Sequence, residues 1–391
     1  MICHPNKGLG LTSLIKVIIL VLFLTGIHSV SGQTENNEKK LDFYGDFRFR
    51  SELDWNNINQ SGDLIDDRFR FRYRARAGFT YQLKDWVGFG AKIRTGEPDK
   101  QQDPNLTLGA VYKEFGGLPI GFATAYIEFK HKWLRAWLGK NNFPFLKQNE
   151  LFWSDAVYPE GIAAIGAFNF ENNIIEQLRV SAGHFVVESN GGSFKDDATL
   201  QGIQLASTHL SGKLIIMPTF FQFNELPEIP DQDGGFTLDY SIIQLGAKAK
   251  ILSNPDLVFG MDFYENLQDY SDDEMISDKF KDQTTGLVSY LSLGDLKTKG
   301  HYIFSITFTY LERYSAVDYF AQNDWTRWSY SAQGSKDGRL TNYRGVQLGA
   351  GYALNENLNL QVKCYLVEQL IPLGESKESG NRIRFDLNIS L

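Results

Sequence analysis

The nine residues from Arg68 to Arg76 read Arg-Phe-Arg-Phe-Arg-Tyr-Arg-Ala-Arg, so arginine occupies every second position and an apolar residue each position between. Because side chains alternate between the two faces of a β-strand, this pattern places five guanidinium groups on one face and the aromatic rings on the other. A soluble sheet would have to keep parallel cations in water and cover a wide aromatic face. A membrane barrel offers water inside and lipid outside, so the pattern favours a transmembrane β-barrel.

The amino terminus has the form of a secretory signal peptide. Lys7 and Lys16 precede the apolar run 17–24, and small residues follow up to Gly32. Such a run is too short for a membrane anchor, because roughly 30 Å of hydrocarbon requires about 20 apolar residues. We therefore expect a signal peptide at 1–32, a periplasmic lead-in at 33–40 and a barrel at 41–391.

Composition excludes several other classes of protein. No apolar stretch after residue 32 is long enough for a membrane helix, and 22% of the chain is charged. Cys364 is the only cysteine after the signal peptide, so a disulfide framework and a cysteine-based zinc site are excluded. The net charge of −8 argues against nucleic acid as a partner. Phosphate loops and dinucleotide motifs are absent, and we expect no cofactor and no metal.

Alternating apolar and polar residues recur in segments along the whole chain. Both ends, 41–55 and 381–391, alternate in this way, as barrel closure requires. The other predicted strands are 67–83, 86–96, 120–130, 132–140, 161–170, 174–187, 199–208, 212–224, 239–251, 256–265, 284–293, 299–312, 342–352 and 356–369. The total is about sixteen strands, with fourteen and eighteen left open.

The connections between these segments alternate between short and long. Short periplasmic turns and long extracellular loops are typical of an antiparallel outer-membrane barrel, and an even strand count returns both termini to the periplasm. Trp86 and Trp133 follow two of the short turns, where an indole suits the membrane interface. A secreted β-sandwich or β-helix is the alternative, but it would not show this rhythm.

The long connections are acidic. Their acidic residues are Asp63, Asp66, Asp67, Glu225, Glu228, Asp231, Asp233, Glu265, Asp269, Asp272, Asp273, Glu274 and Asp278. We interpret them mainly as solvated loop charge, with bridging to surface lipid through divalent cations as the alternative. The segment from Asp231 to Gly234 lacks the other ligands of an EF-hand, so no calcium site is predicted.

If the last strand closes against the first, one wall of the lumen is rich in cations. The cations are Arg48, Arg50, Arg68, Arg70, Arg72, Arg74, Arg76, Lys92, Arg94, Arg382 and Arg384, against the acids Asp42, Asp46, Glu52, Asp54 and Asp386. A confined surplus of positive charge concentrates anions, and arginine also binds carboxylate or phosphate in a bidentate manner. The alternative is that these charges pair with one another and serve stability alone.

A sixteen-stranded barrel leaves an open channel unless a loop narrows it. The candidate for a constriction is the long segment 141–160, which is apolar in places and poorly suited to free solvent. Its candidate residues are Phe145, Phe152, Trp153, Asp155 and Glu160.

An enzymatic function is not supported. Histidines that could act as bases, namely His184, His209 and His301, fall in three separate elements without a neighbouring nucleophile pattern. We therefore expect a protein without catalytic residues.

Several motifs, in this order, resemble the amino-terminal half of a family of bacterial outer-membrane barrels described as putative porins. They are Gly45 to Arg50, the arginine row, Arg94-Thr95-Gly96, Asp103-Pro104-Asn105, Leu108-Gly109, Gly139-Lys140, Pro144-Phe145, Trp153-Ser154-Asp155 and Pro159-Glu160-Gly161. The resemblance covers about residues 40–165, and the remainder matches as pattern. It implies a passive channel in the outer membrane. The arginine row is also similar to that of barrels that export alginate.

These observations lead us to expect a porin for passive diffusion of small hydrophilic solutes, with a preference for anions. A selective channel for import or export of acidic, alginate-like oligosaccharides is the alternative, and a structural or adhesin barrel is a third. The expected partners are outer-membrane lipid, lipopolysaccharide, and small anionic or sugar solutes. A monomer and a homotrimer both remain open.

Overall fold

The computed structural model describes residues 40–98, 101–102, 104–110, 116–171, 174–193, 195–227, 237–325 and 340–391. The predicted signal peptide, residues 33–39 of the lead-in, Asp103, Glu228, Asp231 and Asp233 lie outside the described residues. Within these ranges, no helix is long and apolar enough to cross a membrane. The helical structure in them is one 3-10 turn, η1 (Asp318–Phe320).

Sixteen long antiparallel strands form one sheet, which confirms the predicted all-β fold and strand count. They are β1 (Leu41–Ile58), β3 (Arg68–Lys84), β4 (Val87–Thr95), β6 (Ile120–His131), β7 (Leu134–Lys140), β8 (Glu160–Asn169), β9 (Gln177–Glu188), β10 (Ala198–His209), β11 (Leu214–Pro227), β12 (Thr237–Ser253), β13 (Asp256–Asn266), β14 (Thr285–Gly294), β15 (Tyr302–Leu311), β16 (Tyr343–Asn355), β17 (Leu358–Gln369) and β18 (Ser379–Ser390). Two short strands, β2 (Leu64–Ile65) and β5 (Leu106–Thr107), pair with β1 and β3. Every predicted segment overlaps one of the long strands.

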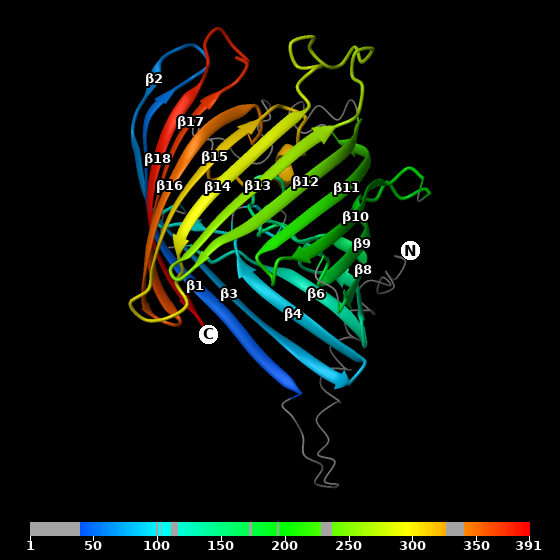
Figure 1. Cartoon of the computed structure of the whole chain (residues 1–391). Helices are drawn as coiled ribbons and strands as arrows, with labels where there is room; N and C mark the ends of the chain where they lie inside the picture. Colours follow the sequence, from blue (N-terminus) through cyan, green and yellow to red (C-terminus); the bar gives the residue numbers. More distant parts are fainter. Residues whose placement is uncertain are drawn as a thin grey trace, which may run out of the picture. The chain divides into compact units, whose positions relative to one another are not determined.

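Strand β1 closes the barrel. It pairs with β3 along one edge and with β18 along the other, so that Phe47 lies opposite Ala75 and also opposite Ile389. The sheet thus has no open edge, and Figure 1 shows its tilted strands around a single barrel.

Short turns lie at one end of the barrel and long connections at the other (Figure 1). The turns after β3, β6, β12 and β16 each contain two residues, and we call this end the short-turn end and the opposite end the long-loop end. Trp86 and Trp133 lie within two of these turns, one position before the strands that they were expected to begin. Both are exposed at the rim, where an indole suits the membrane interface.

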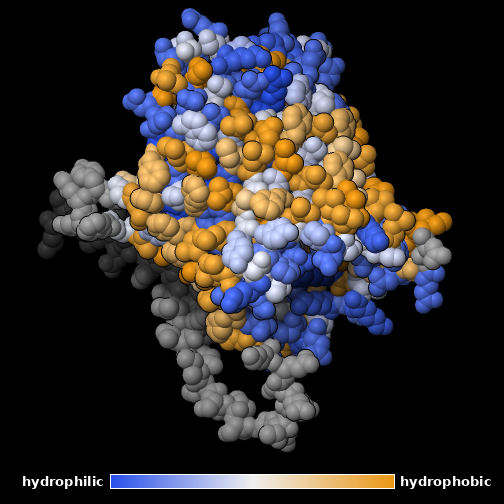
Figure 2. Space-filling view, turned by 60° about the vertical axis from the view of Figure 1, so that its left-hand side comes forward, coloured by the Kyte–Doolittle hydropathy of each residue, from blue (hydrophilic) through white to orange (hydrophobic). Residues whose placement is uncertain are grey.

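The outer surface of the barrel is apolar. Phe47, Phe49, Phe69 and Phe71 are exposed on the outward faces of β1 and β3. Figure 2 shows the resulting apolar band between two hydrophilic zones. The band matches the lipid-facing belt of a membrane barrel, so the arginine row has its aromatic face toward lipid as predicted.

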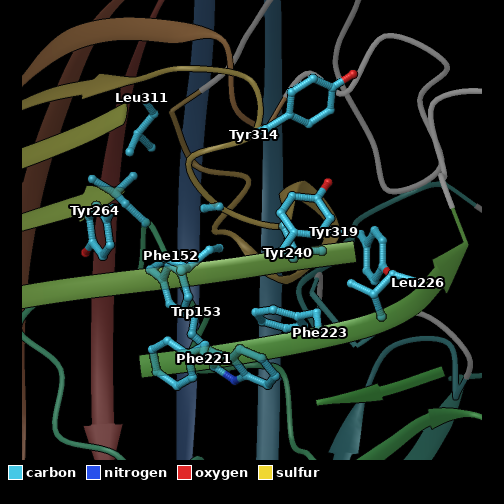
Figure 3. Packing of buried hydrophobic residues seen from close by; sticks show 14 of the residues in the cluster. Phe152, Trp153, Phe221, Phe223, Leu226, Tyr240, Tyr264, Leu311, Tyr314 and Tyr319 are labelled. Carbon is cyan, nitrogen blue, oxygen red and sulfur yellow. The ribbon is translucent and has the colours of Figure 1, made fainter. Parts of the chain in front are cut away.

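The buried apolar core lies inside the barrel, against one side of its wall. Lumen-facing aromatic rings of β11, β12 and β13 pack against the chain between β7 and β8, which folds inward (Figure 3). The ring of Phe152 stacks on Tyr264 at a centroid distance of 5.2 Å and on Phe221 at 4.9 Å. The lumen is therefore partly filled by side chains, and the remaining cavities lie beside β1, β3, β4 and β14 to β18.

A pair of glycines marks the place where this segment leaves the wall. Gly139 and Gly161 lie opposite each other on β7 and β8, with φ of 112° and 155°. A Cβ atom on Gly161 would lie 2.2 Å from the carbonyl oxygen of His184, and one on Gly139 would lie 2.5 Å from that of Ala125. Only glycine fits both the backbone angle and the close approach of the neighbouring strands.

Candidate functional site

Three cavities lie in the lumen and share lining residues. Cavity I, of about 360 Å³, lies beside Tyr44 and Tyr158; cavity II, of about 290 Å³, lies beside Tyr290. Cavity III, of about 140 Å³, lies against the arginines of β1 and β3. Asp155 of the inward segment borders all three, and we call the space of these cavities the free path.

Toward the long-loop end, the cations of the wall are paired with acids. Arg50 binds Asp386 through two hydrogen bonds, from Nε at 2.6 Å and from Nη2 at 3.0 Å. Arg382 binds Asp54 in the same bidentate manner, at 2.5 and 3.1 Å. Arg70 pairs with Glu52 across β1 and β3. These three arginines contribute to stability through internal pairing, although Arg50 also lies opposite a second cation, Arg72.

In the middle of the wall, cations lie directly opposite cations on neighbouring strands. The pairs are Arg48 with Arg74, Arg50 with Arg72, Arg76 with Arg94, and Lys363 with Arg384. Like charges in directly opposite positions destabilise a sheet. Asp46 accepts hydrogen bonds from both Arg74 and Arg76 at 2.6 Å, so one carboxylate serves two guanidinium groups. We call this region the cation patch.

The predicted pore-lining residues divide into two groups. Arg48, Arg50, Arg74, Arg76 and Arg384 line cavity III, and Lys92 lines cavity I, where its ammonium lies 4.3 Å from the centroid of the Tyr158 ring. The others, which line none of the three cavities, are Arg68, Arg70, Arg72, Arg94 and Arg382. Arg94, for example, donates to the backbone carbonyls of Thr95 and Glu97, both at 3.0 Å.

The predicted constriction segment does enter the lumen, but its residues have different positions. Phe145, Phe152 and Trp153 are buried in the lumen core and do not border the free path. Asp155 does border it and pairs with Lys147. Glu160 opens β8, pairs with Lys140 at 2.5 Å and lines none of the three cavities.

A second inward segment, residues 312–325 after β15, was not anticipated from the sequence. Its Phe320 accepts a hydrogen bond from the backbone N–H of Ser154 at 2.7 Å and stacks on Trp153 at 4.5 Å. Its Asp324 pairs with Arg384. The signal that identified 141–160 was present here too, because Tyr314, Tyr319, Phe320 and Trp325 make this connection too aromatic for free solvent.

Lys363 and Glu150 also border cavities II and III without having been predicted. Lys363 shares its face of β17 with Asn359 and Gln361, so the alternation of the predicted strand 356–369 already placed it in the lumen. Glu150 lies in the inward segment, where no periodicity indicates the direction of a side chain.

The histidines do not form a catalytic group. His184 interacts with Gln201 at 3.1 Å, His209 with Ser207 at 2.8 Å and His301 with Asp295 at 2.9 Å. These pairs lie on different strands and turns. Within the described ranges, no cluster of His, Cys, Asp or Glu could hold a metal ion. The site therefore consists of charged and polar side chains around the free path.

Solved structures with the same fold are porins and outer-membrane channels. OprB of Pseudomonas putida matches with a TM-score of 0.55 and 13% identity, over 90% of this chain and 94% of that one. OmpF of Salmonella typhi, in complex with daunomycin, matches with a TM-score of 0.52 and 12% identity, over 90% of this chain and 97% of that one. The outer-membrane channel DcaP of Acinetobacter baumannii matches with a TM-score of 0.50 and 11% identity, over 90% of this chain and 97% of that one. At these identities the likeness shows the fold.

No sequence among the curated proteins matches the chain. The model of one protein family, described as Putative porin, matches residues 56–210 and 221–390, which is more than half of the chain. Its members are channels and not enzymes, in agreement with the prediction from the histidines. The chain thus belongs to the Putative porin family and is a β-barrel channel of the bacterial outer membrane.

Proposed function

We propose that this porin passes small hydrophilic solutes by passive diffusion and prefers anions. The observation that carries the proposal is the cation patch, in which four cation pairs lie directly opposite each other. On their other neighbouring strand, Arg50, Arg76 and Arg384 lie opposite the acids Asp386, Asp46 and Glu52. Arg48 and Arg74 lie opposite each other and have no acid directly opposite on either neighbouring strand. The repulsion between these two arginines is best understood as the cost of attracting an anion from solution.

The charge around cavity III supports the same preference. Six cationic and four acidic side chains line this cavity, so its lining has a surplus of positive charge. A net positive charge acts on anions over about 8 Å at physiological salt, which is the scale of a narrow channel. Arginine adds directed hydrogen bonds to carboxylate or phosphate.

The size of the free path favours small solutes over acidic oligosaccharides. Two inward segments, 141–160 and 312–325, divide the lumen beside the patch into cavities of at most about 360 Å³. A polymer would have to pass Asp155 in an extended form, whereas a single small solute can pass from one cavity to the next.

Reversal potentials of the purified protein in planar bilayers test the proposal. The double variant Arg48→Gln with Arg74→Gln removes one opposed pair and leaves Asp46 bound to Arg76. The reversal potential in a salt gradient should move toward cation preference, most strongly at low ionic strength. Arg135→Gln is the control, because Arg135 pairs with Glu128 and lines none of the cavities. Equal reversal potentials in the wild type and the double variant would refute the anion preference.

The proposal also includes maturation and assembly. We propose that residues 1–32 direct export and are removed, that the barrel contacts lipopolysaccharide, and that it assembles as a homotrimer. The mass of the mature chain tests the first part. Native mass spectrometry of the protein extracted from membranes tests the other two.

A further inference from the structure

Lys363 differs from the arginines around it. Within the described part of the chain its ammonium group makes no hydrogen bond and no ion pair. Its directly opposite neighbour is Arg384, another cation, whose guanidinium is engaged by Asp324 and by Asp386 at 3.5 Å. Lys363 thus presents three donor hydrogens to the lumen without a protein acceptor.

The cavity next to Lys363 is lined by neutral hydrogen-bonding groups. Cavity II has the amides of Gln148, Asn149, Gln322 and Gln347, and the hydroxyls of Tyr290 and Thr307. Its charged residues are two lysines and two acids, so its lining has no net charge. The amides of Gln148 and Asn149 donate to Asp262, whereas those of Gln322 and Gln347 each offer a donor and an acceptor, which is what a hydroxyl group requires of its partners.

Lys363 lies on the border between two different environments. It lines cavity II, which is neutral and rich in amides, and also cavity III, which has a surplus of cations. A solute bound across this border would place its negative charge at Lys363 and its hydroxyl groups in cavity II. The volume of about 290 Å³ is at the lower end for small-molecule sites, which span about 300–1,000 Å³.

We propose that Lys363 and cavity II form a binding site for a single sugar acid, a hydroxylated ring that bears one carboxylate. This inference rests on the proposed anion preference and adds the class of solute. The carboxylate accepts hydrogen bonds from Nζ of Lys363, and the ring hydroxyls exchange hydrogen bonds with Gln322 and Gln347. Simple anions lack the hydroxyls, and neutral sugars lack the carboxylate, so neither can use both parts of the site.

Block of the chloride current in planar bilayers tests this site, with glucuronate, acetate and glucose as probes. For the wild type, glucuronate should halve the current at a concentration at least about tenfold lower than acetate or glucose, because it alone makes both the charge-assisted and the neutral hydrogen bonds.

Three variants separate the parts of the site. Lys363→Gln removes the charge of the side chain and should raise the concentration of glucuronate that halves the current about tenfold. Lys363→Arg keeps the charge and should leave this concentration close to that of the wild type. Gln347→Ala should weaken block by glucuronate but not by acetate. Lys248→Gln is the matched control, since Lys248 faces the lumen from β12 and lines none of the three cavities.

Two results would overturn the inference, and both are distinct from failure of the proposed function. If the wild type prefers anions but glucuronate blocks no better than acetate, the sugar-acid site is wrong and the anion preference stands. The sugar-acid site is also wrong if Lys363→Gln and Lys248→Gln change the blocking concentration of glucuronate equally. A wild type that shows no anion preference would refute the proposed function itself.

Discussion

Asp324 of the second inward segment pairs with Arg384 of β18, and its Oδ1 lies 3.4 Å from Nη1 of Arg50. One carboxylate therefore ties residues 312–325 to the charged wall on the other side of the free path. Both arginines are almost fully buried, so the loss of this acid would leave two cations short of a partner.

We expect Asp324→Asn to lower the free energy of unfolding by about 1.5–3 kcal/mol, the usual contribution of a hydrogen bond to a charged group. The released segment should also increase the noise of the open-channel current. Asp155→Asn is the comparison, because the carboxylate of Asp155 is largely exposed and its ion pair with Lys147 is therefore worth only about 0–1 kcal/mol. A similar change in stability for both variants would contradict the buried role of Asp324.

A second contact holds the other inward segment. Asp262 of β13 is buried and accepts hydrogen bonds from the amides of Gln148 at 3.0 Å, Asn149 at 2.6 Å and Gln244 at 3.1 Å. Two of these donors belong to the segment 141–160. Asp262→Ala should destabilise the barrel by about 3 kcal/mol, because three donors, one of them buried, lose their acceptor.

The same change should widen the channel, since the segment is no longer held at β13. We expect a higher single-channel conductance for Asp262→Ala, measured together with chemical unfolding of the folded protein in micelles. Asp262→Asn keeps one acceptor oxygen and should give a smaller effect on both quantities. An unaltered conductance in the alanine variant would show that the segment is fixed by its aromatic contacts instead.

The barrel could be predicted from the sequence because each strand carries its own signal. The alternation from Arg68 to Arg76 is fixed by the geometry of a single strand and requires no knowledge of distant residues. The turn at Trp86 is likewise a local feature. Strand number and order follow once the short and long connections are recognised.

The pairing of charges in the lumen could not be predicted in this way. The wall was expected to hold the acids Asp46, Glu52 and Asp54, but their partners depend on the register between β1, β3 and β18. Asp324 comes from a loop without periodicity, and its position depends on how two loops pack against each other. The aromatic lumen core has the same origin, because Phe152 meets Tyr264 of β13 only after the segment 141–160 folds inward.

The outward and inward assignments can be tested with lysine substitutions. Phe49 is exposed to lipid near the middle of β1, and Phe49→Lys should cost about 2–4 kcal/mol of barrel stability. Ser292→Lys introduces the same group on the lumen face of β14 and should cost far less, because it remains in water. Unfolding in urea from lipid vesicles measures both. Equal costs would mean that the two faces were assigned wrongly.

The glycine pair gives a prediction about the start of the inward segment. Gly161→Ala requires a side chain at φ 155° and a Cβ 2.2 Å from the carbonyl oxygen of His184. We expect a loss of about 1–3 kcal/mol from the backbone conformation, with displacement of β9 in addition. Gly212→Ala at φ 78° in an open turn isolates the backbone contribution, because no atom lies within 4 Å of the added Cβ. If both variants unfold at the same denaturant concentration, the close approach of the strands is unimportant.

Asp318 in η1 predicts how stability depends on pH. Burial raises the pKa of this carboxyl from 3.8 to about 6, and Arg313 opposes the shift only in part. Because the pKa is higher in the folded protein than in the unfolded chain, the stabilising contribution is complete below about pH 4 and is lost as the pH rises through about 6. The melting temperature of the wild type should therefore fall between pH 4 and 7 relative to Asp318→Asn, which cannot ionise.

Asp269→Asn serves as the control, because hydrogen bonds from Ser271 lower the pKa of Asp269. The melting temperature of Asp269→Asn should therefore fall between pH 4 and 7 as that of the wild type does. Parallel pH curves for the wild type and Asp318→Asn would show that Asp318 is not buried in its neutral form.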